Sequence, residues 1–410
     1  MNDQPANPAA WLPFSIVEAA RAGRTSPEGV DMAKDWTGLL SQLGAAAHLV
    51  TGSPFTRNRL DLASGFRHLL VLAAIGIDEV LRFDPDPILA VSRAPTDDVL
   101  TWGMDCPDAI YTRATLWGGE SYRLFGNRGT ARYVGLQTMN GIQATANAVV
   151  DELEMDQAGN FEVIISADER EGNWLRIDGD YPTVVVRHFF YDWNSEVPSS
   201  LRIERIGRRA ERKSRPSDAD GLVSRQVRAL GEFVYTNLRF FHDWGSAPPA
   251  NGFLEPGDLS AVGAAAENRP VIGRWELGPD EALILEIKPP NGVYWSYSLG
   301  NPWWETIHYG RHQSSLNGHQ VAVDSDGLVR VVVCARDPGV ANWLDTAGYS
   351  NGAMILRCVR TDTAPTPITR VVKFDEIAAA LPADTKTVTP DERTAIVAAR
   401  RRAVHQRFAR

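Results

Sequence analysis

The spacing of hydrophobic residues changes several times along the chain. Between about residues 15 and 83, apolar side chains recur three and four positions apart, as they do from Leu39 to Leu43, and this period predicts helices. Pro85 and Pro87 end the pattern, because proline lacks a backbone donor and its ring clashes with the preceding helical turn. The sequence therefore predicts a helical N-terminal region.

Short apolar runs broken by Gly, Asn and Asp follow, and they are typical of β-strands. They occupy about residues 98–206 and 271–359, and a basic stretch and a helical segment lie between them. We expect five parts: a helical region over 1–100, a first β domain over 101–207, a basic linker and helical connector over 208–268, a second β domain over 269–365, and a helical tail over 366–410.

The two β regions resemble each other. In each, an Asp stands five residues before an Asn-Trp-Leu tripeptide, which begins at Asn173 in the first region and at Asn342 in the second. A turn of the type Asp-x-x-Gly followed by an apolar run precedes both tripeptides. This spacing favours an internal duplication, and recurring turn chemistry is the alternative. The predicted fold is mainly β with helical additions (α+β), built from two tandem, pseudo-repeated antiparallel β-sandwich or jelly-roll-like domains.

Three features together resemble a known family. They are the paired Asn-Trp-Leu segments, the run VVVRHFFYDWNSEVP over 184–198 and the run NWLDTAGYSNGAMILRC over 342–358. Over about 105–206 and 280–360 the chain resembles the bacterial domain-of-unknown-function 1214 family. The resemblance implies a mainly β, jelly-roll-like architecture with helical additions in soluble bacterial proteins. That family carries no agreed reaction, so the resemblance assigns no catalytic residue.

Charge and cysteine content exclude several classes of protein. The chain of 410 residues has 42 basic and 51 acidic side chains, so a general nucleic-acid-binding surface is not expected, even though seven basic residues lie between Arg202 and Arg215. The three cysteines form no CxxC pair, which argues against a disulfide framework or a four-cysteine zinc site. No Walker or G-x-G-x-x-G motif occurs, so we expect no nucleotide and no redox cofactor.

Targeting signals are also missing from the pattern. The first 15 residues lack a basic segment followed by an apolar one, and the longest apolar run, Leu69 to Ile77, is shorter than the roughly 20 residues that span a bilayer. We therefore expect a cytoplasmic protein without a membrane partner. The apolar residues among the arginines after Asp391 predict a helix that docks on its own or on a partner subunit, which leaves a homo-oligomer open.

Residues 294–320 combine aromatic rings with histidines more densely than the rest of the chain. Aromatic rings bind flat apolar ligands, and histidine transfers protons near neutral pH. An aromatic domain or subunit interface is the alternative. We expect His308 and His312 to be catalytic. The expected substrate contacts are Tyr297, Asn301, Trp303, Trp304 and Tyr309.

The strand predicted over 184–192 supplies two further candidates. Its alternation puts His188 and Asp192 on one face, and we expect both to be catalytic at the border of a cavity whose other wall is the 294–320 segment. The alternative is that Asp192 caps a turn and that His188 is a core residue.

These residues predict an acid–base enzyme of lyase, isomerase or hydrolase type that uses neither metal nor cofactor. Its substrate is an apolar aromatic or alicyclic small molecule. A non-catalytic binding or assembly protein that uses the same aromatic surface is one alternative. A metal-dependent jelly-roll enzyme is another, because Glu305, His308 and His312 are spaced as ligands on one helical face, although Gly310 argues against a helix there.

Overall fold

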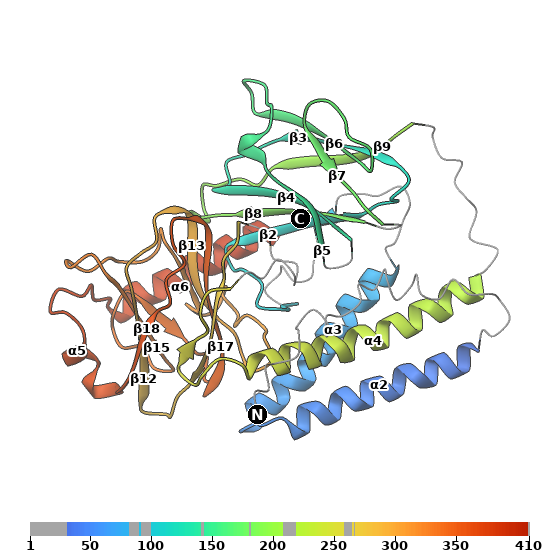
Figure 1. The fold of residues 1–410 in the computed structure, drawn as a ribbon. Helices are drawn as coiled ribbons and strands as arrows, with labels where there is room; N and C mark the ends of the chain where they lie inside the picture. Colours follow the sequence, from blue (N-terminus) through green and yellow to red (C-terminus); the bar gives the residue numbers. More distant parts are fainter. Residues whose placement is uncertain are drawn as a thin grey trace, which may run out of the picture.

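The computed structural model describes residues 31–81, 90–91, 100–140, 143–179, 182–207, 219–257, 265 and 267–408. Within them the chain forms two β-sandwiches, a layer of long helices and a C-terminal helix (Figure 1). The fold is mainly β with helical additions, as the hydrophobic pattern predicted.

The first sandwich consists of two sheets that bury their facing sides against each other. One sheet has the strand order β1-β2-β8-β4-β5 and the other β7-β6-β3-β9. On β6, Phe161, Val163 and Ile165 alternate with more exposed residues and enter the shared core. The strands are β1 (Ala90–Val91), β2 (Ala109–Thr115), β3 (Ser121–Asn127), β4 (Tyr133–Asn140), β5 (Gln143–Val149), β6 (Asn160–Ser166), β7 (Trp174–Arg176), β8 (Thr183–Phe189) and β9 (Ser200–Ile206).

The second sandwich repeats this plan. Its sheets have the orders β10-β11-β17-β13-β14 and β16-β15-β12-β18. Its central strands β12 and β15 are buried along nearly their whole length. The strands are β10 (Gly252–Phe253), β11 (Val271–Glu276), β12 (Glu281–Ile287), β13 (Gly292–Leu299), β14 (Ser315–Asn317), β15 (Val329–Cys334), β16 (Trp343–Asp345), β17 (Asn351–Thr361) and β18 (Ile368–Lys373).

The two sandwiches share one topology. If β2–β9 are matched in order to β11–β18, the strand order of both sheets is the same. The tripeptides fall on equivalent strands: Trp174 pairs with Ile164 in the parallel pair β6–β7, and Trp343 pairs with Val332 in the parallel pair β15–β16. This correspondence supports the predicted duplication. The common origin of the two units and their jelly-roll-like character stay predictions.

Three long helices form a layer beside the sandwiches (Figure 1). They are α2 (Met32–Gly52), α3 (Arg59–Leu81) and α4 (Ala219–Gly245), and their shared core includes Val50, Leu72 and Phe233. The span Arg59–Asp78 of α3 is long and apolar enough to cross a membrane by length and composition, but 44 % of it is buried inside the protein. We therefore describe α3 as a helix of this layer.

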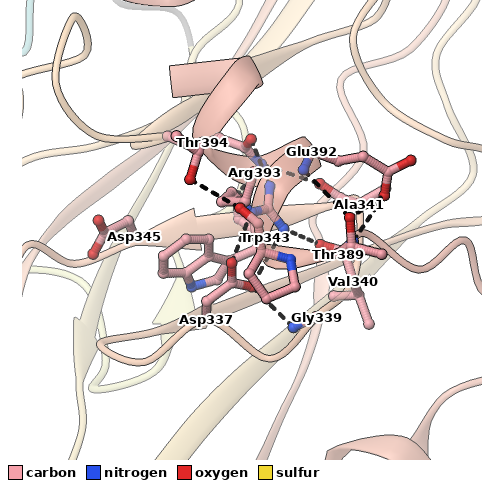
Figure 2. Close-up of polar contacts among 12 residues, drawn as sticks. Asp337, Gly339, Val340, Ala341, Trp343, Asp345, Thr389, Glu392, Arg393 and Thr394 are labelled. Carbon is pink, nitrogen blue, oxygen red and sulfur yellow. Dashed lines mark hydrogen bonds and ion pairs between the residues drawn. The ribbon is translucent and has the colours of Figure 1, made fainter. Parts of the chain in front are cut away.

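The C-terminal helix α6 (Pro390–Phe408) lies across both sandwiches and places an arginine on them at every seventh residue. Arg393 donates to Gln313 and to the carbonyl oxygen of Val340, with its guanidinium over the ring of Trp343 (Figure 2). Arg400 and Arg407 lie farther along the helix. Seven-residue spacing keeps side chains on one face of a helix, so this row of cations joins α6 to the β units.

The N-terminus of α6 is capped by side chains. Glu392 accepts a hydrogen bond from the backbone of Thr389 at 2.8 Å, and Thr389 Oγ1 accepts one from the backbone of Glu392 at 3.3 Å (Figure 2). This reciprocal pair satisfies two amide groups that the helix itself leaves without acceptors. The capping box fixes where the helix starts, and therefore which residues face the sandwiches.

In two places the secondary structure differs from the prediction. The tail predicted as helical from residue 366 begins with the strand β18, which pairs with β12 along the sheet edge, and a short helix α5 (Ile377–Ala380) precedes α6. The short strand β1 lies in the region predicted to be helical. Neither strand shows a strong alternation of apolar and polar residues, so each is recognised only by its pairing with a neighbouring strand.

Candidate functional site

The two adjacent tryptophans of the 294–320 segment are buried against the helices. Trp303 is 1 % exposed, joins the core of the helical layer and donates a hydrogen bond from Nε1 to the carbonyl oxygen of Asp61 at 2.8 Å. Trp304 stacks on Phe241 and Trp244 of α4, with ring centroids 5.5 and 5.3 Å apart. Both rings therefore anchor the second sandwich to the helical layer.

The two tyrosines expected to contact a substrate are buried in other places. Tyr297 is 1 % exposed in the core of the second sandwich, where burial raises the pKa of its hydroxyl well above the ordinary value. Tyr309 is fully buried edge-on against Trp193, at a centroid distance of 6.2 Å. The structure therefore does not gather the predicted aromatic contacts around one ligand surface.

The loop that carries the tryptophans is held by one amide. The side-chain oxygen of Asn301 accepts hydrogen bonds from the backbone of Trp303 at 2.9 Å and of Glu305 at 3.2 Å, and its nitrogen donates to Glu305 Oε2 at 2.7 Å. Trp304 has a φ of 61°, which is rare for a bulky side chain and shows how tightly the loop turns. Asn301 thus orients Glu305.

Glu305 forms a buried ionisable cluster with α3. Its Oε1 atom lies 2.8 Å from Arg67 Nη1 and 3.3 Å from Nδ1 of His68, a histidine with no solvent exposure. Burial alone would raise the pKa of Glu305, but His68, Arg67 and Asn301 outweigh it and lower the pKa. The loop therefore places a charged carboxylate against a buried imidazole.

Further polar groups of α3 face the second sandwich. Ser64 Oγ lies 2.6 Å from the hydroxyl of Tyr349, and Asp61 Oδ2 accepts a hydrogen bond from the backbone of Arg57 at 3.0 Å. Burial raises the pKa of Asp61 despite these hydrogen bonds. Asp61, Ser64 and His68 are three and four residues apart, so they form a buried polar stripe along one face of a helix that is mostly apolar between its ends. That stripe is the sequence signal that could have identified them.

An accessible histidine–carboxylate pair lies at the turn after β16. His312 Nδ1 is 2.7 Å from Asp345 Oδ2, and the two side chains are 36 % and 15 % exposed. Asp345 Oδ1 also accepts a hydrogen bond from the backbone of Ala347 at 2.7 Å, which fixes the carboxylate. The same turn leads to Tyr349, so it connects the accessible pair to the buried cluster on α3. Of the candidate histidines, His312 thus has an orienting carboxylate.

The other predicted catalytic residues lie apart from this pair or act in turns. His308 is partly buried, and its carbonyl oxygen accepts the backbone hydrogen bond of His312 at 2.9 Å. His188 is 1 % exposed in β8 and stacks on Phe190. Asp192 caps a turn by accepting from Ser195 Oγ at 2.6 Å and from the backbone of Asn194, and these bonds lower its pKa. His188 and Asp192 therefore do not join His312.

The predicted meeting of the 294–320 segment with the end of β8 does occur, but as a packed polar contact. The carboxylate of Asp108, which is fully buried, accepts hydrogen bonds from Trp193 Nε1 at 2.6 Å, from the hydroxyl of Tyr294 at 2.7 Å and from Asn317 Nδ2 at 2.8 Å. Three donors satisfy this carboxylate, so it joins the two sandwiches.

Two further features of the described part of the chain, possible metal ligands and a surface groove, do not involve the predicted site residues. Within the part of the chain that the structure describes, no group of three or more His, Cys, Asp or Glu side chains is arranged to hold a metal ion. Glu305 faces α3 while His312 faces Asp345, so these two do not converge as ligands. A surface groove of about 640 Å³ lies between α2 and α4, and its lining includes Lys34 and Arg228 but no predicted site residue.

Comparisons with known proteins identify relatives without assigning an activity. No protein-family model matches the chain, and no functionally curated protein matches it. A crystal structure from Vibrio parahaemolyticus is 12 % identical, with a TM-score of 0.44 over 75 % of this chain and 98 % of that one. The crystal structure of an uncharacterized Burkholderia cenocepacia protein is 30 % identical, with a TM-score of 0.76 over 85 % of this chain and 98 % of that one. The chain belongs to the same family as this Burkholderia cenocepacia protein.

Proposed function

We propose that this protein is an acid–base enzyme of lyase, isomerase or hydrolase type that acts on an apolar aromatic or alicyclic small molecule, with His312 as its proton-transfer group. The observation that supports this most directly is the 2.7 Å contact between His312 Nδ1 and Asp345, in a side chain that solvent still reaches. A carboxylate on one ring nitrogen orients the imidazole and leaves the other nitrogen to exchange a proton with a substrate.

In this mechanism the proton balance is simple. In an elimination or isomerisation, His312 removes a proton from substrate carbon, Asp345 stabilises the imidazolium that forms, and the proton passes to the leaving group or back to the product. In a hydrolysis, His312 removes the proton from the water that attacks the acyl carbon and passes it to the leaving oxygen. Burial raises the pKa of Tyr349, so its hydroxyl stays protonated where it meets Ser64 of α3. His308, in the same turn as His312, is the second candidate for proton transfer.

The buried cluster has a positioning role in this proposal. Glu305 and Asn301 hold the loop, and Ser64 holds the Tyr349 hydroxyl at 2.6 Å from α3. The turn with Asp345 is thereby fixed from two sides. The alternative of an assembly protein that uses the aromatic segment is less well supported, because Trp303, Trp304 and Tyr309 are buried within the chain.

Two broader assignments accompany this proposal. We propose a cytoplasmic location, because Cys106, Cys334 and Cys358 are free thiols, as expected of a reducing compartment. We also propose membership of the domain-of-unknown-function 1214 family on the tripeptide motifs.

The test is an activity screen with matched variants. Purified protein is incubated with chromogenic esters and lactones for hydrolysis, and with cyclic ketones in D₂O, where proton NMR detects abstraction at carbon. On any compound that is turned over, His312→Gln and Asp345→Asn should lower kcat by roughly 10²–10⁴-fold. The control is His405→Gln, an exposed histidine on α6, which should retain the full rate.

Equal rates for His312→Gln and the unchanged protein would show that His312 is not the catalytic group. If no compound is turned over and none raises the Tm, the enzyme proposal fails, and a non-catalytic role becomes the better account.

A further inference from the structure

The outward face of α3 is apolar along almost the whole helix. From Leu60 onward its exposed positions follow each other at intervals of three and four residues, and none of these carries a charge or a polar side chain. The exposed Arg59 precedes them at the first position of the helix. Leu70 is 73 % exposed, more than the other large apolar residues of this face. We define the α3 stripe as these exposed residues: Leu60, Ala63, Phe66, Leu70, Ala74 and Ile77.

Such a stripe is unusual on a helix surface that faces water. Solvent-facing positions of an amphipathic helix are polar, and a continuous apolar surface of this length, about 25 Å, marks an interaction site. The opposite face of α3 is already occupied, because Leu72 and Ile75 enter the helical core and His68 contacts Glu305. The stripe is therefore a second apolar face that the described part of the chain does not cover.

The order of side-chain sizes along the stripe fits a second copy of the same helix. From Leu60 to Ile77 the sizes run large, small, large, large, small, large, which is the same in both directions. In an antiparallel pair related by a two-fold axis near residue 68, Ala63 faces Ala74 of the partner subunit, and the reverse contact is equivalent. Small residues allow close helix approach at these two points, and Phe66 and Leu70 fill the centre.

The charges of the protein disfavour a membrane as the surface that covers the α3 stripe. A helix that lies on a membrane carries Lys and Arg along its polar face, whereas the polar face of α3 contains the buried Asp61 and His68. Arg67 is partly exposed, but its guanidinium is paired with the buried Glu305. The chain has a net charge of −9, so an anionic lipid surface repels it. An uncharged stripe can face its own copy without placing like charges in contact.

We propose that two copies of this protein form a homodimer through antiparallel packing of their α3 stripes. The interface would end close to the candidate site, because a Cβ added at Gly348, in the turn after Asp345, would lie 4.0 Å from Leu60. The antiparallel arrangement brings Ile77 of the partner subunit next to Leu60. The proposal rests on the stripe and does not depend on catalysis.

The first test measures mass in solution by light scattering and sedimentation, using the full chain. The unchanged protein should have twice the chain mass of 45.1 kDa at micromolar concentration. Leu70→Glu should be a monomer with an unchanged circular-dichroism spectrum, because a charge at the centre of the stripe must be desolvated in the dimer. The control Ile368→Glu changes an apolar residue that is 69 % exposed on β18, and it should remain a dimer.

The second test measures the direction of packing. A mixture of Ala63→Cys chains and Ala74→Cys chains should give a cross-linked pair of one chain of each kind upon mild oxidation. Each variant alone should give at least tenfold less cross-linked product. Because Cys106, Cys334 and Cys358 are buried, they do not compete in this reaction.

Three outcomes would overturn the proposal. A monomeric unchanged protein would mean that the stripe is covered within one chain. A Leu70→Glu variant that stays dimeric would place the interface elsewhere, for example at the exposed Trp36 of α2. Binding of the unchanged protein to neutral phosphatidylcholine vesicles, abolished by Leu70→Glu, would identify a lipid surface as the partner.

Discussion

Asn173 and Asn342 make the same three hydrogen bonds at the same place in two different sandwiches. Each side-chain nitrogen donates to two backbone carbonyl oxygens, at 2.9 and 2.9 Å for Asn173 and at 2.7 and 3.0 Å for Asn342. Each side-chain oxygen accepts one backbone amide, at 2.9 and 2.8 Å respectively. The amide side chain thus replaces a missing stretch of strand, which explains why both tripeptides begin with Asn.

We predict that Asn173→Ala and Asn342→Ala each lower the free energy of unfolding by roughly 1–3 kcal/mol, because each leaves backbone groups without partners. Urea denaturation of both variants measures this loss. The exposed Asn291 provides the control, since Asn291→Ala should change stability by less than about 0.5 kcal/mol. A large loss in only one of the two variants would show that the two positions are not equivalent.

The buried carboxylates of the α3 cluster should give opposite pH effects. The pKa of Glu305 is lowered in the folded protein, so its contribution to stability is present above its ordinary pKa and is lost as the pH falls through the folded-state value. Glu305→Gln should therefore cost about 3 kcal/mol at neutral pH and progressively less in acid. Thermal unfolding between pH 3 and 8 tests this, and a cost that is independent of pH would contradict it.

Asp61 should behave in the reverse way. Burial raises its folded-state pKa, so ionisation of this carboxyl lowers stability as the pH rises from the ordinary value through the folded one. Asp61→Asn should raise the Tm at neutral pH, and the gain should vanish in acid, where both side chains are neutral. A lower Tm for this variant at pH 7 would mean that the charge of Asp61 is needed.

The buried guanidinium of Arg400 should be important for the attachment of α6. It donates to the carbonyl oxygens of Tyr309 at 3.0 Å and of Ser315 at 3.1 Å, and it lies over the ring of Trp193. Arg400→Met keeps much of the apolar volume but removes the donors, so we expect a loss of about 2–4 kcal/mol. The exposed Arg401 is the matched control, and equal stability of Arg400→Met and Arg401→Met would contradict the prediction.

The three thiols should be unreactive in the native protein. Burial raises the pKa of Cys106 to about 11 and those of Cys334 and Cys358 to about 12, and the thiolate is the reactive form. Iodoacetamide at pH 8 should modify none of them within the time that it modifies all three in 8 M urea. Mass spectrometry of the intact chain counts the modified thiols, and rapid labelling of one native thiol would disprove this assignment.

Local pattern predicted the strands well, and long-range contacts explain what it missed. The run Phe161 to Ser166 alternates because one face enters a core, and this is visible without a structure. The contact between Arg67 and Glu305 joins residues 238 positions apart, and no spacing rule reaches that far. The aromatic density of the 294–320 segment does not distinguish burial against helices from burial around a ligand, because both require the same residue types.

At the candidate site, too, the contacts between residues far apart in the sequence could not be predicted. His312 was identifiable by its chemistry, whereas its partner Asp345 is 33 residues away, at the end of a short strand that pairs in parallel. Alternation predicts one strand face for His188 and Asp192, but β8 ends at Phe189 and Asp192 lies beyond it in the turn that it caps. His188 shares its face of β8 with Val184 and Val186, which enter the interior of the first sandwich. The alternation of residues along a strand identifies which side chains share a face. Only the tertiary fold determines what packs against that face.

Because α6 follows both sandwiches in the sequence, it can pack on them only late during synthesis. Ribosomes add residues from the N-terminus at about 5–20 per second, so both sandwiches are complete before Arg393, Arg400 and Arg407 emerge. Until then the Trp193 ring, which Arg400 and Arg407 later cover at 4.6 and 4.8 Å, is open on the nascent chain. A chain released before α6 is made therefore exposes the Trp193 ring to chaperones and proteases.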